Sequence, residues 1–150
     1  MYSKQEASLI RKNFWTKFGQ YMKPLPGADG EPVNWLNYKT GIKQVFFRMD
    51  ADNKRAVIAV EIRRPDADIR KEYFQKLEEL KPWFHQSMNE DWEWQLNTTD
   101  EDGKVLSRIG KTLNGVNIFN SDDWPAIISF FKPRIILLDE FWSVAKERFT

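Results

Sequence analysis

Apolar side chains in the last thirty residues of the chain recur at alternating steps of four and three positions. They are Trp124, Ile128, Phe131, Ile135, Leu138, Trp142, Ala145 and Phe149. This spacing predicts a long helix from Asp123 to Phe149 with an apolar seam. A second apolar flank accompanies the seam at Ile127, Phe130, Ile136, Leu137, Phe141 and Val144. A helix on one side of a small domain rarely hides two flanks, so something must cover each of them.

Two arrangements would cover the second flank once the first packs on a sheet. In one, the same helix of a second copy packs there across a two-fold axis, which predicts a homodimer. The interface residues of that dimer would be Ile135, Leu138, Phe141 and Trp142. In the other, the N-terminal helix and a proline-rich loop of the same chain cover the flank in a monomer.

The first forty residues predict a helix followed by an irregular loop. Ser3 and Glu6 have the spacing of a capping box, and apolar residues follow at helical spacing to residue 22. Residues 23–40 contain three prolines and two glycines, which exclude regular structure. The large aromatics of this loop, Trp35 and Tyr38, either serve a binding site or plug the loop onto the core.

Residues 42–49 and 55–63 alternate apolar and polar positions, which predicts a β-hairpin. A two-residue loop at Asp52 and Asn53 would place apolar residues opposite one another on one face. The expected pairs are Val45 with Val60, Phe47 with Ile58, and Met49 with Ala56. The other face, which carries Phe46 and Arg48, is half polar, and we expect it to meet water or a partner.

The second half of the chain predicts a helix from Asp66 that Pro82 kinks or restarts. A strand around residues 92–96 and its partner at residues 104–111 form a second hairpin, and residues 116–119 are a possible fifth strand. Together these elements predict a single α+β domain over residues 1–150. Its mainly antiparallel sheet packs with three helices, of which the C-terminal one is long.

Composition excludes several classes of function. The chain has no cysteine and one histidine, so disulfide frameworks, thiol nucleophiles, iron–sulfur clusters and structural zinc sites are excluded. No apolar run has the length of a signal peptide or a membrane span. We therefore expect a cytoplasmic protein with no cofactor, no metal site and no membrane partner.

The charge is unevenly distributed along the chain. Residues 1–64 contain 12 Lys or Arg and 6 Asp or Glu, whereas residues 65–150 contain 11 and 16. In the basic half, cations and aromatic rings interleave in a pattern typical of surfaces that bind single-stranded nucleic acid. This tentative DNA or RNA surface comprises Arg11, Trp15, Trp35, Tyr38, Lys39 and Lys43. Burial in the core is the better explanation of the same rings, because aromatic side chains are usually buried.

Acidic residues of the first hairpin imitate the motif of metal-dependent nucleases. Asp50 precedes Glu61-Ile62-Arg63, although these enzymes have lysine where Arg63 stands. In the predicted register Glu61 lies opposite Gln44, ~20 Å along the hairpin from Asp50, which is too far to share a metal ion. A structural role explains them better: Asp50 and Asp52 as turn residues, and Glu61 as the partner of an arginine. We assign no catalytic residue.

The final helix carries one acidic interruption, Asp139-Glu140, in its apolar run. A carboxylate there either points outward or meets a cation such as Arg134 across an interface.

Three segments resemble the uncharacterised bacterial domain-of-unknown-function family 4268. They are RKNFWTKFGQYM, VNWLNYKTGIKQVFFRMDADNKRAVIAVEI and IFNSDDWPAIISFFKPRIILLDEFW. The resemblance extends over nearly the whole chain, but the family has no established activity or catalytic residues. Its domain also occurs behind N-terminal parts that look like nucleases, and this implies an accessory or targeting module.

Three functions follow as hypotheses. The first is a non-enzymatic interaction domain that self-associates through the C-terminal helix. The second is a nucleic-acid-binding accessory module of a restriction or defence system. The third is a metal-dependent nuclease centred on Asp50, Asp52 and Glu61. We expect the chain not to be an enzyme.

Overall fold

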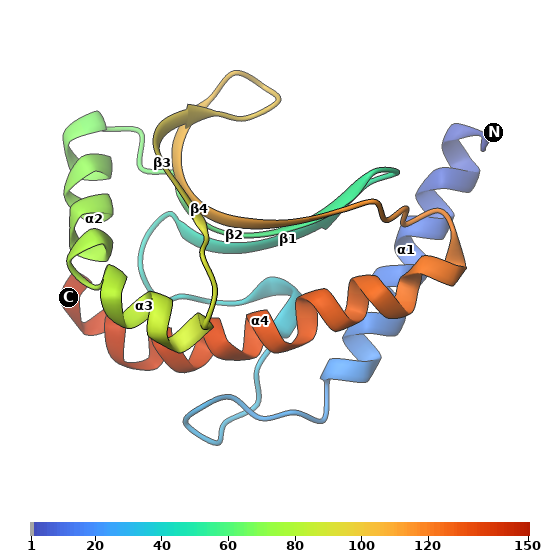
Figure 1. Cartoon of the computed structure of the whole chain (residues 1–150), viewed down its shortest axis with the longest axis horizontal. Coiled ribbons are helices and arrows are strands. Elements are labelled where there is room, and N and C mark those ends of the chain that lie inside the picture. Colours follow the sequence, from blue (N-terminus) through green and yellow to red (C-terminus); the bar gives the residue numbers. More distant parts are fainter. Residues whose placement is uncertain (1) are drawn as a thin grey trace.

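The computed structural model describes residues 2–150, which form a four-stranded antiparallel sheet packed on helices (Figure 1). The helices are α1 (Lys4–Met22), α2 (Ala67–Glu79), α3 (Lys81–Met88) and α4 (Trp124–Ala145). The strands are β1 (Val45–Ala51), β2 (Arg55–Ile62), β3 (Glu93–Thr99) and β4 (Val105–Asn114). Short 3-10 turns lie at Trp35–Asn37, Ser121–Asp123 and Lys146–Phe149. The predicted α+β class with a long C-terminal helix is confirmed.

The N-terminal helix begins where the capping box predicts. Ser3 is the N-cap of α1, and its hydroxyl accepts a hydrogen bond from the backbone N–H of Glu6. The helix buries Phe14, Phe18 and Met22 against the core.

The sheet has the strand order β1-β2-β4-β3. In the first hairpin the loop consists of Asn53 and Lys54, because the N–H of Asp52 donates to the carbonyl of Arg55. Phe47 therefore lies opposite Val60, and the predicted pairing is wrong by two residues. A shift of two retains the alternation of faces, so the predicted core face is right and Phe47 is buried.

The structure decides two predictions for the second half. The helix after Asp66 is divided at Leu80 and restarts with Pro82 in the first turn of α3, one of the two outcomes predicted for this proline, so residues 2–150 contain four α-helices rather than three. The possible fifth strand at residues 116–119 is a loop. Its backbone bonds go to the turn between β1 and β2: the N–H groups of Val116 and Ile118 donate to the carbonyls of Lys54 and Asp52.

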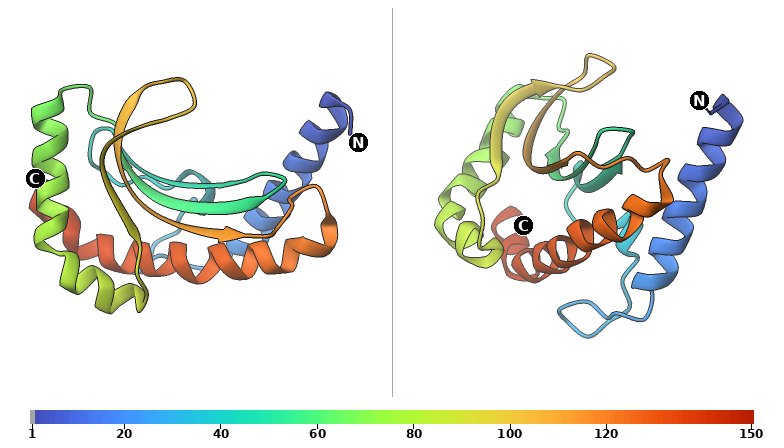
Figure 2. Two further views of the ribbon diagram at one scale, coloured as in Figure 1. Left: turned by 45° about the horizontal axis from the view of Figure 1, so that its top comes forward. Right: turned by 45° about the vertical axis from the view of Figure 1, so that its right-hand side comes forward.

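The second hairpin is bent by an irregularity in β3. The register shifts between Gln95 and Thr98, and Asn97 has a φ of 56°, in the left-handed region. Leu96, which period-two alternation places beside Trp94, is therefore 41% exposed. Beyond this point the hairpin curls back over the sheet (Figures 1 and 2).

The long helix α4 runs continuously through Pro133 beneath the sheet (Figure 1). Parts of the same chain cover both of its flanks. Phe131 packs on Trp15 and Phe18 of α1, while Phe141 packs on Trp83 and Phe84 of α3.

This coverage corrects the expected interface between two copies. Ile135, Leu138, Phe141 and Trp142 are each at most 3% exposed in the single chain, so they are core residues. The indole N–H of Trp142 also donates to the backbone carbonyl of Thr40, 2.7 Å away. Within one chain α4 is thus covered by α1 and the proline-rich loop, as the monomeric alternative expects, and also by α3.

Asp139 on α4 is buried and holds the proline-rich loop. Its carboxylate accepts hydrogen bonds from the hydroxyl of Tyr38 at 2.5 Å and from the N–H of Ala28 at 2.7 Å. Burial and this carboxylate together raise the pKa of Tyr38 far above its usual value. Both expectations for Asp139 are wrong, since it points inward and Arg134 pairs with Glu90 instead, at 2.8 Å.

All the helices lie on one face of the sheet or at its ends, and the opposite face carries none in residues 2–150 (Figures 1 and 2). Within the same residues, every helix is too short or too polar to cross a membrane.

Candidate functional site

The sheet surface that points away from α4 is hollowed, and we call it the concave face (Figure 1). Alternation along the central strands supplies its side chains. They are Phe46, Arg48 and Asp50 from β1, Val57, Ala59 and Glu61 from β2, and Arg108 from β4. The curled β3–β4 hairpin hangs over this face and contributes Glu101 from its tip.

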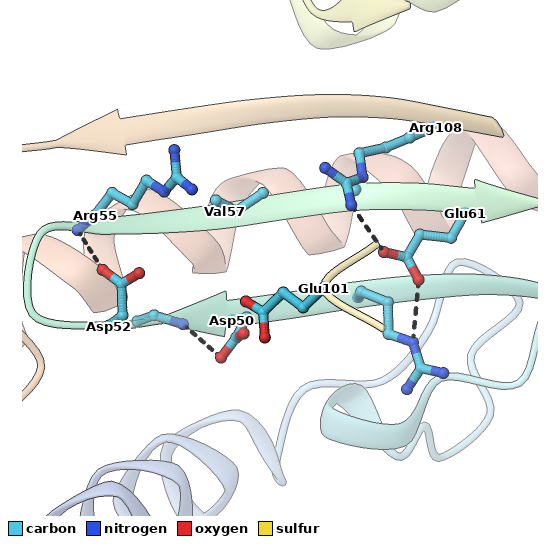
Figure 3. Close-up of a pocket in the computed structure, with 10 residues that line it drawn as sticks. Asp50, Asp52, Arg55, Val57, Glu61, Glu101 and Arg108 are labelled. Carbon is cyan, nitrogen blue, oxygen red and sulfur yellow. Dashed lines mark hydrogen bonds and ion pairs between the residues drawn. The ribbon is translucent and has the colours of Figure 1, made fainter. Parts of the chain in front are cut away.

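A buried carboxylate organises the arginines of the concave face. Glu61 is 6% exposed, and its oxygens lie 3.4 Å from Nε of Arg48, 2.9 Å from Nε of Arg63 and 3.8 Å from Nη2 of Arg108. Figure 3 shows Glu61 and Arg108 turned toward each other across β2 and β4. Three guanidinium groups around one carboxylate have more N–H donors than Glu61 can accept.

Arg63 also ties the curled hairpin to the sheet. Its Nη1 donates to Asp100, 2.9 Å away, while its Nε donates to Glu61. Burial lowers the pKa of Arg63, but the hydrogen bonds to Asp100 and Glu61 outweigh it and raise the pKa above its usual value. The same bond from Arg63, with backbone N–H groups of the hairpin, lowers the pKa of Asp100.

Two hollows share Arg48 as their common wall. The mixed hollow, of about 150 Å³, is lined by both signs of charge, with Asp50, Asp52, Glu61 and Glu101 facing Arg48, Arg55 and Arg108 (Figure 3). The cationic hollow is larger, about 700 Å³. Its lining consists of Gln44, Phe46, Arg48, Arg63, Pro65, Arg70, Lys104 and Val105. All four charged residues of that lining are basic.

The walls of the cationic hollow are fixed in different ways. Arg70 is buried on α2, where it donates to Asn97 at the β3 irregularity and to the carbonyls of Arg64 and Pro65. Arg48 is open: its side chain is 55% exposed, and its guanidinium lies 4.6 Å from the ring centroid of Phe46. The hollow therefore combines rigid and accessible cations.

The aromatic members of the expected nucleic-acid surface lie in or against the core. Trp35 is buried and donates its indole N–H to the carbonyl of Leu25. Trp15 belongs to the aromatic cluster between α1 and α4, and Tyr38 stacks on Phe47 at 4.7 Å. The aromatic residues of the proline-rich loop therefore pack the loop onto the core, which is the second of the two roles considered for them.

The basic members of that surface are scattered. Arg11 lies against the far end of β1, where its guanidinium donates to the carbonyl of Ala51 and lies over the ring of Phe119. Lys39 and Lys43 are exposed on the loop before β1. The structure thus does not bring the six residues together into one stacking surface.

The residues of the nuclease hypothesis keep structural roles. Asp52 accepts hydrogen bonds from the N–H groups of Lys54 and Arg55, and Glu61 pairs with arginines, as predicted. Asp50, predicted as a turn residue, lies instead within β1 opposite Val57, because the turn begins later than expected. In the observed register Glu61 lies opposite Phe46, four positions or ~13 Å along β1 from Asp50. Across residues 2–150, His, Asp and Glu side chains form no group of three that could hold a metal ion.

Sequence reasoning identified only part of the concave face. The polar alternation of the first hairpin indicated that Phe46 and Arg48 face a solvent or a partner. It gave no sign of Arg70 or Lys104, because the curl of β3 and β4 brings them to the same hollow from distant parts of the chain.

Comparison with known proteins identifies a family without a named activity. The model of the family described as domain of unknown function DUF4268 matches residues 10–146. Neither a curated protein nor a solved structure gives a significant match.

Proposed function

We propose, from the premise that this chain belongs to the DUF4268 family, that it is a nucleic-acid-binding module whose binding surface is the concave face. The observation that carries this proposal is the cationic hollow. Its four charged residues are all basic, and the ring of Phe46 lines the same hollow. Phosphate groups require the cations, and nucleobases suit the apolar ring surface.

The state of the arginines supports a role in binding an anion. Glu61 is shared among three of them, Arg48, Arg63 and Arg108. A guanidinium has five N–H donors, so Arg48 and Arg108 keep donors for phosphate oxygens after their contacts with Glu61. The carboxylate would hold the arginines in place before the ligand arrives.

Salt dependence of oligonucleotide binding tests the proposal. We expect the protein to bind a fluorescent single-stranded oligonucleotide at low salt and to release it as salt rises, because phosphate binding displaces counterions. Lys104→Glu should weaken binding several-fold and make the slope of log affinity against log salt shallower by about one. The measurement is fluorescence anisotropy over a range of salt concentrations.

Lys12→Glu on α1 is the matched control, since Lys12 is exposed and lies outside the lining of either hollow. It makes the same change of charge and should leave affinity nearly unchanged. Equal losses in the two variants, or binding that ignores salt, would contradict the concave face as the site.

A further inference from the structure

Arg48 and Phe46 form a cation–π pair in the cationic hollow. The guanidinium carbon of Arg48 lies over the ring of Phe46, 4.6 Å from its centroid, and Glu61 lies 3.4 Å from its Nε. The guanidinium is thus held by a ring and a carboxylate, while the side chain remains 55% exposed. A planar guanidinium held in this way is a stacking platform for another planar group.

Apolar side chains also line the hollow. Val105 of the curled hairpin is 45% exposed, and Pro65 belongs to the same lining. Phosphate alone would leave these surfaces in water, whereas a nucleobase has two apolar faces and a polar edge. The lining therefore fits a base and its neighbouring phosphate together, with Arg63 and Lys104 as the cations nearest the hairpin.

The hairpin restricts the shape of the ligand. It hangs over the sheet in both views of Figure 2, and Arg63 holds it down through Asp100. Glu101 at its tip lines the mixed hollow together with residues of β1 and β2. A duplex, which keeps its bases stacked inside, could not bring a base face onto Arg48 beneath this hairpin, but an unpaired strand could.

We propose that the cationic hollow binds an unpaired nucleotide of a single strand, with its base stacked on Arg48 and its phosphate between Arg63 and Lys104. This inference rests on the proposed function and adds the class of nucleic acid. It predicts that single strands bind and duplexes of the same sequence bind at least tenfold more weakly. It also predicts that Arg48 contributes to affinity in two ways, through its positive charge and through stacking of its planar group on the base.

The test compares Arg48→Lys with wild type on three probes: a single-stranded 12-mer, its duplex and inorganic polyphosphate. Lysine retains the charge but not the planar group, so we expect about a tenfold loss for the single strand, within the range measured for one stacked base. Affinity for polyphosphate should change less than twofold, because it has no bases. Arg148→Lys is the matched control: the same substitution on an exposed residue outside the lining of both hollows.

The outcomes separate this inference from the proposed function. The inference fails, while nucleic-acid binding stands, if the duplex binds as tightly as the single strand. It also fails if Arg48→Lys weakens the binding of the single strand and of polyphosphate equally. If a free mononucleotide binds as tightly as the 12-mer, the ligand is a nucleotide and not a nucleic-acid strand, and the inference fails. If no nucleic acid binds even at low salt, the proposed function itself fails. Melting temperatures of both variants near that of wild type show that the fold is intact.

Discussion

Asp139 shows how one buried carboxylate can join two distant segments. Its two acceptor bonds reach the side chain of Tyr38 and the backbone of Ala28, more than one hundred positions away in the chain. A buried donor that loses its acceptor has a desolvation penalty of about 1 to 3 kcal/mol. The carboxylate therefore matters to stability through the two groups that it satisfies.

Removal of this carboxylate should destabilise the protein. Asp139→Ala leaves both the Tyr38 hydroxyl and the Ala28 N–H without an acceptor, so we expect a loss of about 2 to 4 kcal/mol of unfolding free energy. Tyr38→Phe, which removes one donor and leaves the carboxylate bonded to Ala28, should cost about 1 kcal/mol. Urea unfolding followed by tryptophan fluorescence measures both, and equal stabilities of Asp139→Ala and wild type would refute this role.

At the scale of the element, the first hairpin shows what a local pattern can predict. Alternation assigned Phe47 to the core and Phe46 to the opposite face, because the period of a strand is two and survives an error of two in register. The turn was misplaced because the Asp52 carboxylate binds two backbone N–H groups, and its carbonyl accepts from Ile118. The second of these contacts joins residues too far apart for turn rules to anticipate.

The two phenylalanines should differ in their contribution to stability. Phe47 is 7% exposed and packs on Tyr38 and Trp142, so Phe47→Ala should cost about 3 to 5 kcal/mol. Phe46 is half-buried beneath Arg48, and Phe46→Ala should cost less than half as much. Chemical denaturation of both variants gives the comparison, and equal costs would mean that both faces of the hairpin are packed.

At the scale of the whole molecule, the packing of α4 was predictable only as a pair of alternatives. The two apolar rows of this helix indicated how much of its surface must be buried. The same pattern is compatible with burial against a second copy or against other elements of the same chain. The choice depended on α3, which Pro82 separates from α2 and which places Trp83 and Phe84 against Phe141. The cationic hollow was unpredictable for a related reason, since the bend in β3 sets its shape.

The coverage of α4 predicts the mass of the particle in solution. Val144 is the one residue of the seam and the second flank that is exposed, so α4 offers a second copy no continuous apolar surface, and we expect light scattering at micromolar concentration to give 17.9 kDa. Val144→Asp should leave that mass and the melting temperature unchanged, because Val144 is 57% exposed. A mass of twice this value would show that the homodimer forms through another surface.

The ties between the two ends of the chain also set an order of events during synthesis. The Tyr38 hydroxyl and the Thr40 carbonyl bind residues of α4 that are translated about one hundred positions later. A nascent chain that has not yet released α4 from the ribosome exposes the apolar faces of α1 and of the sheet with nothing to pack against. The domain therefore completes its fold only after α4 emerges, and until then those apolar faces are open to aggregation.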